Sequence, residues 1–126
     1  MASFLLFVYG TLKRDGVRHP ALLGATFVGL ATTRPCYSLF DLGSYPGMKR
    51  GDGVVHGELY EVDQRSIPHL DAVEGAPNLF RLEEIEITGG PAWAYLFVPE
   101  VDDRLRILNG IWRNTPPPLE PPFCPR

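Results

Sequence analysis

The sequence has little positive charge and few cysteines, and each shortage narrows the range of functions. Twelve Lys and Arg residues stand against fifteen Asp and Glu residues, so the formal net charge is -3 over 126 residues. Proteins that bind the backbone of nucleic acids usually carry a basic surplus, and we therefore expect no nucleic-acid partner. The two cysteines, Cys36 and Cys124, form no C-x-x-C pair, which is typical of reduced thiols in a cytoplasmic protein.

Long apolar runs are also absent. Residues 1–8 are apolar, but no basic residue precedes them and no small-residue cleavage site follows before Gly10. This segment is a poor signal peptide, and it is much shorter than the roughly 20 residues that a membrane-spanning helix needs. We therefore expect no membrane partner.

The sequence contains no motif for a nucleotide or a metal ion. Neither G-x-G-x-x-G nor G-x-x-x-x-G-K-[ST] occurs. The three histidines, His19, His56 and His69, do not have the spacing of metal ligands. The sequence therefore indicates neither a nucleotide loop nor a metal site.

What the sequence does contain is a succession of short strands. Runs of branched and aromatic residues predict strands at 4–9, 26–33, 37–42, 54–62, 82–88 and 92–98. Glycine and proline clusters predict turns at 43–47, 50–53 and 89–91. Within the fourth strand, Gly57 indicates a bulge or a close approach of two backbones.

Two helices are predicted beside these strands. Helical spacing indicates a helix over 66–74, which Ser66 caps and Gly75 ends. A second, short helix is predicted over 104–112. Because strands and helices do not alternate, the predicted fold is α+β, a small barrel-like mixed sheet with a few short helices.

The chain divides into a domain over 1–114 and a proline-rich tail over 115–126. Six of the last eleven residues are proline, which prevents a helix and favours extended chain. Composition favours a tail that packs along the surface or stays disordered over one that binds a protein. The sequence does not indicate what a protein partner of the tail would be.

Two places could carry chemistry. Gly10 follows the first strand, where a turn can expose successive N–H groups to a carboxylate or an oxyanion, although a plain turn would look the same. Glu74 comes at the end of the predicted helix, where the negative end of the helix dipole raises the pKa of a carboxyl group. It could be a proton shuttle or an exposed residue, and Asp71 could be a second acid.

Four motifs together resemble the gamma-glutamylcyclotransferase family, including its AIG2-like and gamma-glutamylamine cyclotransferase branches. They occur in the right order over about residues 4–98: Tyr9-Gly10-Thr11-Leu12, Val55-His56-Gly57-Glu58-Leu59-Tyr60, Leu70-Asp71-x-x-Glu74-Gly75 and Phe80-Arg81. The resemblance implies a small barrel-like fold without a cofactor. It also implies that Tyr9, Gly10, Thr11 and Leu12 bind a gamma-glutamyl group and that Glu74 is catalytic.

The implied activity is intramolecular aminolysis of a small gamma-glutamyl substrate, which releases 5-oxoproline and a free amine. The family commonly has tyrosine where Phe80 stands, so a hydroxyl contact is missing there, and Tyr45 or Tyr95 could supply a phenol instead. Arg81 could bind a substrate carboxylate or pair with a neighbouring glutamate. The leaving amine is open, with short loops favouring small gamma-glutamyl amines. A binding protein that keeps the fold without catalysis is the alternative.

Overall fold

The computed structural model describes residues 2–22 and 24–114, so the predicted tail over 115–126 lies outside the described residues. The described elements, in chain order, are β1 (Ser3–Val8), η1 (His19–Leu22), β2 (Thr26–Thr32), β3 (Tyr37–Asp41), β4 (Pro46–Arg50), β5 (His56–Asp63), η2 (Gln64–Ser66), α1 (Ile67–Glu74), β6 (Phe80–Ile87), β7 (Gly90–Phe97) and η3 (Asp103–Leu105).

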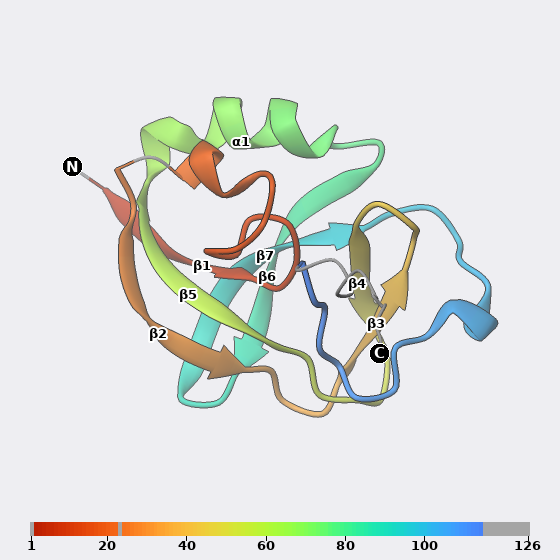
Figure 1. The fold of residues 1–126 in the computed structure, drawn as a ribbon. Coiled ribbons are helices and arrows are strands. Elements are labelled where there is room, and N and C mark those ends of the chain that lie inside the picture. Colours follow the sequence, from red (N-terminus) through yellow and green to blue (C-terminus); the bar gives the residue numbers. More distant parts are fainter. Residues whose placement is uncertain (1, 23, 115–126) are drawn as a thin grey trace, which may run out of the picture.

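Five strands form one curved mixed sheet in the order β2-β5-β1-β7-β6 (Figure 1). The central strand β1 is antiparallel to β5 and parallel to β7. The two edges of the sheet meet at one end, because Thr33 bridges Ile87 and the N–H of Thr88 donates to the carbonyl of Thr32 at 2.9 Å. The predicted α+β fold with a barrel-like mixed sheet is therefore confirmed.

Small residues allow this sheet to curve. A side chain at Gly57 in β5 would place its Cβ 2.3 Å from the carbonyl oxygen of Val8, so only glycine lets the two strands approach so closely. The close approach predicted at Gly57 is confirmed. The pairing of β2 with β5 shifts register between Phe27 and Gly29, and such a bulge increases the local twist.

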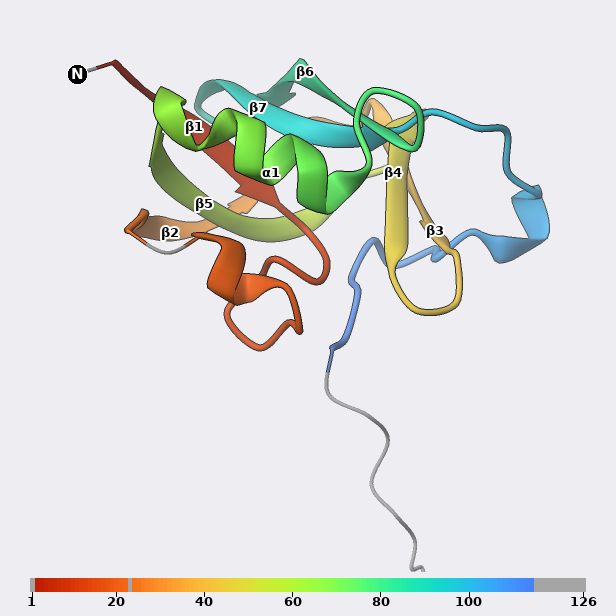
Figure 2. The ribbon, with the colours of Figure 1, turned by 90° about the horizontal axis from the view of Figure 1, so that it is seen from above.

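A two-stranded hairpin of β3 and β4 packs beside the curved sheet (Figures 1 and 2). The prediction of a turn through residue 47 was wrong for its second half, because Pro46 and Gly47 already pair with Asp41 and Phe40. Proline is tolerated there because it is the first residue of a strand at an edge. This hairpin brings Pro46 against the turn that follows β1.

Helix α1 lies across one end of the curved sheet (Figure 2). It ends as predicted at Gly75, whose φ of 65° is left-handed and whose N–H returns to the carbonyl of Ala72 at 3.3 Å. The predicted cap at Ser66 was wrong: its side chain makes no capping hydrogen bond, because η2 precedes the helix directly and is itself capped by Asp63. Within the described residues, no helix is long and apolar enough to cross a bilayer.

The predicted helix over 104–112 was also wrong, since only η3 forms there. Gly110 has a φ of 70°, and a Cβ on it would lie 1.9 Å from the carbonyl oxygen of Val54. The backbone is instead held by other parts of the fold, with Ile107 N–H bonded to Leu39 and Gly110 accepting from His56. Ile107 also packs against the core, so this apolar side chain is partly buried without a helix.

Candidate active site

A single cleft collects most of the side chains that the sequence singled out. It contains about 360 Å³ of empty space, part of which is open to solvent. Its walls come from the end of β1 and the loop after it, the start of β4, the last turn of α1, and strands β6 and β7. The lining residues are Phe7, Val8, Tyr9, Gly10, Thr11, Leu12, Arg18, Tyr45, Pro46, Glu74, Phe80 and Tyr95.

Glu74 is the carboxylate of this cleft. It is the last residue of α1 and is only 6% exposed. Its Oε2 atom is buried and has no hydrogen-bond partner among the described residues. Burial raises the pKa of Glu74 above its ordinary value, and the positive charge of Arg18 offsets only part of that rise. The direction predicted from the sequence is confirmed, with burial as the largest cause.

Arg18 is the cation beside this carboxylate. Its Nη1 lies 3.5 Å from Glu74 Oε2, which is within ion-pair range but without the geometry of a hydrogen bond. The guanidinium carbon sits 5.3 Å from the centre of the Tyr45 ring. Arg18 was not predicted from the sequence, because it lies in an irregular loop outside every motif and is brought to Glu74 only by the fold.

The turn after β1 presents free backbone donors to the cleft. Among the described residues, no acceptor is found for the N–H groups of Gly10, Thr11 and Leu12. Pro46 packs directly against this turn, and a Cβ at Gly10 would lie 2.5 Å from its Cγ. A turn with successive N–H groups of this kind could receive an anion, and the contact with Pro46 requires glycine at its first position.

The loop that follows the turn is held from several sides. The N–H of Arg18 donates to the carbonyl of Thr11 at 2.8 Å, and His19 Nδ1 lies 2.9 Å from the carbonyl of Leu12. The buried carboxylate of Glu58 in β5 accepts from the N–H of Arg14 at 2.9 Å and from the hydroxyl of Tyr60 at 3.0 Å. These bonds fix the turn and Arg18 relative to the sheet.

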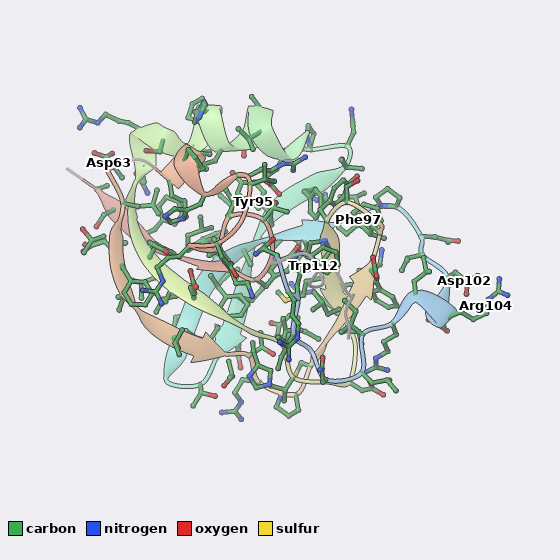
Figure 3. The ribbon with its side chains drawn as sticks, viewed as in Figure 1. Asp63, Tyr95, Phe97, Asp102, Arg104 and Trp112 are labelled. Carbon is green, nitrogen blue, oxygen red and sulfur yellow. The ribbon has the colours of Figure 1, made fainter. Side chains whose placement is uncertain are left out.

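A second support comes from residues 112–114, which we call the C-terminal brace. This segment runs past the loop after β1, and Trp112 marks it in Figure 3. Lys13 Nζ donates to the carbonyl of Trp112 at 2.7 Å, while Asn114 Nδ2 donates to the carbonyl of Gly10 at 2.9 Å and to Asp15 Oδ1 at 3.0 Å. The brace therefore ties the far end of the domain to the carbonyl of Gly10 and to two side chains of the loop that follows it.

The tyrosines of the cleft have different roles. The hydroxyl of Tyr9 donates to the carbonyl of Tyr95 at 2.6 Å and accepts from the N–H of Met48 at 3.2 Å, so it joins strands and is not free for a ligand. Tyr95 points from β7 toward α1 (Figure 3), where its hydroxyl donates to Asp71 Oδ1 at 2.7 Å. Burial is the main cause that raises the pKa of both phenols.

Arg81 was predicted as a substrate contact, and the structure places it elsewhere. Successive residues of a strand face opposite sides, so Phe80 enters the cleft while Arg81 faces solvent. The Arg81 side chain is 58% exposed, and its Nε lies 3.4 Å from Glu83 Oε2. Of the two roles open in the sequence, pairing with a neighbouring glutamate is the one observed.

The other predicted site residues do come together. Tyr9, Gly10, Thr11, Leu12, Tyr45, Glu74 and Tyr95 all line the one cleft. Arg18 and Pro46 also line the cleft, and no local pattern in the sequence distinguishes them. Within the described part of the chain, no three His, Cys, Asp or Glu side chains gather as metal ligands.

Comparison with known proteins gives the family. A model of the family described as gamma-glutamyl cyclotransferase, AIG2-like, matches residues 6–114. The chain belongs to this family. The cyclotransferase match spans every residue that lines the cleft, so the resemblance inferred from the four motifs is confirmed. Membership supports an enzyme of the gamma-glutamylcyclotransferase kind.

Relatives and solved structures agree with this placement of the cyclotransferase chain. A Vibrio cholerae protein with a provisional gamma-glutamylcyclotransferase name is 42% identical over 74% of this chain and 81% of its own. The gamma-glutamylaminecyclotransferase of Rattus norvegicus is 36% identical over 68% of this chain and 69% of its own. The crystal structure of an uncharacterised Pyrococcus horikoshii protein matches with a TM-score of 0.73 and 28% identity, covering 86% and 88% of the two chains.

Proposed function

We propose that this protein is a cyclotransferase that converts a small gamma-glutamyl amine into 5-oxoproline and the free amine. The observation that carries the proposal is the orphaned, buried Oε2 of Glu74, which shares a narrow cleft with the free N–H groups of Gly10, Thr11 and Leu12. A proton acceptor and an oxyanion site within one cleft suit an acyl transfer.

The reaction needs a general base first. Glu74 in its ionised form accepts a proton from the α-ammonium group of the substrate, which leaves a neutral amine. A carboxyl group with a raised pKa is a better match for an ammonium proton than an ordinary glutamate. The freed amine nitrogen then attacks the γ-carbonyl carbon of the same molecule. Since the attack is intramolecular, the cleft contributes mainly by holding the substrate chain in a folded, reactive conformation.

Ring closure moves the carbonyl electrons onto oxygen. The N–H groups of the turn over 10–12 stabilise this oxyanion, and such donors are worth about 3 kcal/mol each in comparable sites. Glu74 then passes its proton to the departing nitrogen, the bond between that nitrogen and the γ-carbon breaks, and the carbonyl re-forms. After the attack the ring nitrogen carries two protons. It keeps one of them in the lactam, and the other moves to the released amine. An ammonium group enters and an ammonium group leaves, so no net proton is consumed.

The nature of the leaving amine is the finer part of the proposal. The cleft is small, with about 360 Å³ of empty space of which part is open to solvent, and this favours a small amine over a large peptide. The name of the Rattus norvegicus relative, a gamma-glutamylaminecyclotransferase, supports the same class of substrate. We therefore propose gamma-glutamyl-ε-lysine and similar gamma-glutamyl amines ahead of glutathione.

The test is a substrate panel. Purified protein is incubated with gamma-glutamyl-ε-lysine, several gamma-glutamyl dipeptides and glutathione, and 5-oxoproline is quantified together with the free amine. The proposal predicts equal amounts of the two products, with gamma-glutamyl-ε-lysine turned over fastest. Glu74→Gln, prepared in parallel, controls for contaminating activity, and Glu100→Gln is the matched control for removal of an exposed charge. Absence of 5-oxoproline with every substrate would favour a binding protein that keeps the fold without catalysis.

A further inference from the structure

Arg18 is the only positively charged side chain among the described residues that line the cleft. Its guanidinium group has no hydrogen-bond acceptor within the described chain, and its contact with Glu74 at 3.5 Å lacks hydrogen-bond geometry. An arginine carries five N–H donors in a planar fork that matches the two oxygens of a carboxylate. The cleft therefore holds a cation whose donors are available to a ligand.

The position of this cation is fixed. The backbone of Arg18 is anchored by its N–H to Thr11 and by its carbonyl, which accepts from Ala21 at 2.9 Å. The side chain lies over the face of the Tyr45 ring and is 31% exposed, so it is partly removed from solvent while still reaching the cleft. A preorganised guanidinium group loses little entropy when it binds an anion.

We propose that Arg18 is the specificity-determining residue that binds the α-carboxylate of the gamma-glutamyl group, an inference that rests on the proposed function. The α-carbon of such a substrate carries an ammonium group and a carboxylate group. Arg18 and Glu74 form the complementary pair: the carboxylate meets the guanidinium group while the ammonium group meets the carboxyl group. One ion pair of the protein thus matches the two charges of an amino-acid head group.

This assignment separates the two anionic groups of the reaction. The α-carboxylate is bound by Arg18, so the N–H groups of the turn over 10–12 remain available for the oxyanion that develops on the γ-carbonyl. The same arrangement places the substrate ammonium group beside Glu74, from which the mechanism takes its first proton. Substrates that lack the α-carboxylate should fit the cleft but lose this anchor.

The first test measures binding without catalysis. The affinities of 5-oxoproline and 2-pyrrolidinone, which lacks only the carboxylate, are measured by NMR titration for the wild type, Arg18→Ala, Arg18→Lys and the control Arg104→Ala. Arg104 is 89% exposed on η3, far from the cleft (Figure 3). We expect the wild type and Arg104→Ala to prefer 5-oxoproline by about 10- to 100-fold, and Arg18→Ala to lose most of that preference, with Arg18→Lys in between.

The second test uses turnover. The kcat/KM values for a gamma-glutamyl amide and for the 4-aminobutyryl amide of the same amine are compared in the same variants. The inference predicts that their ratio collapses in Arg18→Ala, chiefly through KM for the glutamyl substrate. A thermal unfolding profile shows that each variant is folded.

The two proposals fail in different ways. If Arg18→Ala still turns over substrate and still prefers the compounds that carry the carboxylate as strongly as the wild type does, the role of Arg18 is overturned. The proposed cyclotransferase activity would be unaffected by that result. Arg18-dependent binding of 5-oxoproline by a protein that turns over no substrate would support the carboxylate site and overturn the proposed catalysis. A wild type that binds 2-pyrrolidinone as tightly as 5-oxoproline would also overturn the role of Arg18.

Discussion

Asn114 donates a hydrogen bond from Nδ2 to the carbonyl oxygen of Gly10 at 2.9 Å, which connects residues 104 positions apart in the sequence. The same amide nitrogen contacts Asp15 Oδ1, and Asn114 Oδ1 accepts from the indole N–H of Trp112 at 3.0 Å. The end of the described domain thus holds the turn whose free N–H groups share the cleft with Glu74. Residues outside the cleft can control its geometry through this contact.

Removal of this contact should loosen the turn. We expect Asn114→Ala to cost about 1 kcal/mol of stability and to speed amide hydrogen exchange across residues 10–16, because two hydrogen bonds to that loop are lost. Exchange measured by mass spectrometry checks this. Asn78→Ala, at an exposed position after α1, is the control. Unchanged exchange in Asn114→Ala would show that the brace does not restrain the turn.

Gly16 is a further point at which the loop after β1 is constrained. A Cβ on Gly16 would lie 2.0 Å from the carbonyl oxygen of Thr11, which already accepts from Arg18. Gly16→Ala should therefore destabilise the fold by about 1–3 kcal/mol in urea unfolding. Gly29→Ala is the matched control, since nothing lies within 4 Å of a Cβ added at that position, and it should change stability by less than about 0.5 kcal/mol. Equal effects would contradict the close contact.

Tyr9 supports the cleft through its hydroxyl. In Tyr9→Phe, the carbonyl of Tyr95 and the N–H of Met48 lose their partner in a buried position. We expect a loss of about 1–3 kcal/mol in the free energy of unfolding. Tyr45→Phe removes a phenol that makes no hydrogen bond to the described residues and should cost much less. If both variants unfold alike, the hydroxyl of Tyr9 does not join the strands.

The sequence predicted most of the fold, because its strands carry clear local patterns. Glycine and proline misled the prediction where a tertiary contact decides the conformation. Pro46 was predicted in a turn, yet it starts β4 and packs on Gly10. Residues 104–112 were predicted as a short helix, but the chain passes so close to the carbonyl of Val54 that only glycine fits at position 110. Both outcomes depend on contacts between segments far apart in the chain.

The candidate site shows the same contrast between residues that local motifs predict and residues that only the fold brings together. Glu74 and the turn at Gly10 were predicted because each belongs to a local motif at the end of an element. Arg18 was not, because its distance to Glu74 depends on the path of an irregular loop. Arg81 was placed wrongly because a motif neighbour of Phe80 in a strand must face the opposite side.

The raised pKa of Glu74 predicts a pH-dependent effect on stability. A buried carboxyl group whose folded pKa lies above its ordinary 4.5 favours folding while it is protonated, and that contribution is lost as pH rises through the folded pKa. Glu74→Gln stays neutral throughout. Its stability relative to the wild type should therefore increase as the pH rises above the ordinary pKa of 4.5, and should level off once the folded carboxyl group is ionised.

Free energies of unfolding from urea titrations at several pH values check this prediction. Glu100→Gln, which removes an exposed carboxylate, should show no such trend. A Glu74→Gln variant that becomes less stable relative to the wild type as pH rises would show that the folded state favours the ionised carboxylate.

The central claim is that the carboxyl group of Glu74 carries the proton during ring closure. The most direct measurement is kcat for 5-oxoproline release from gamma-glutamyl-ε-lysine by Glu74→Gln, with 5-oxoproline affinity measured on the same preparation. We predict that kcat falls by about 10²- to 10⁴-fold while the affinity changes little, because the amide keeps the shape of the side chain but cannot accept the proton. A variant that binds 5-oxoproline and retains kcat within about threefold would contradict the claim.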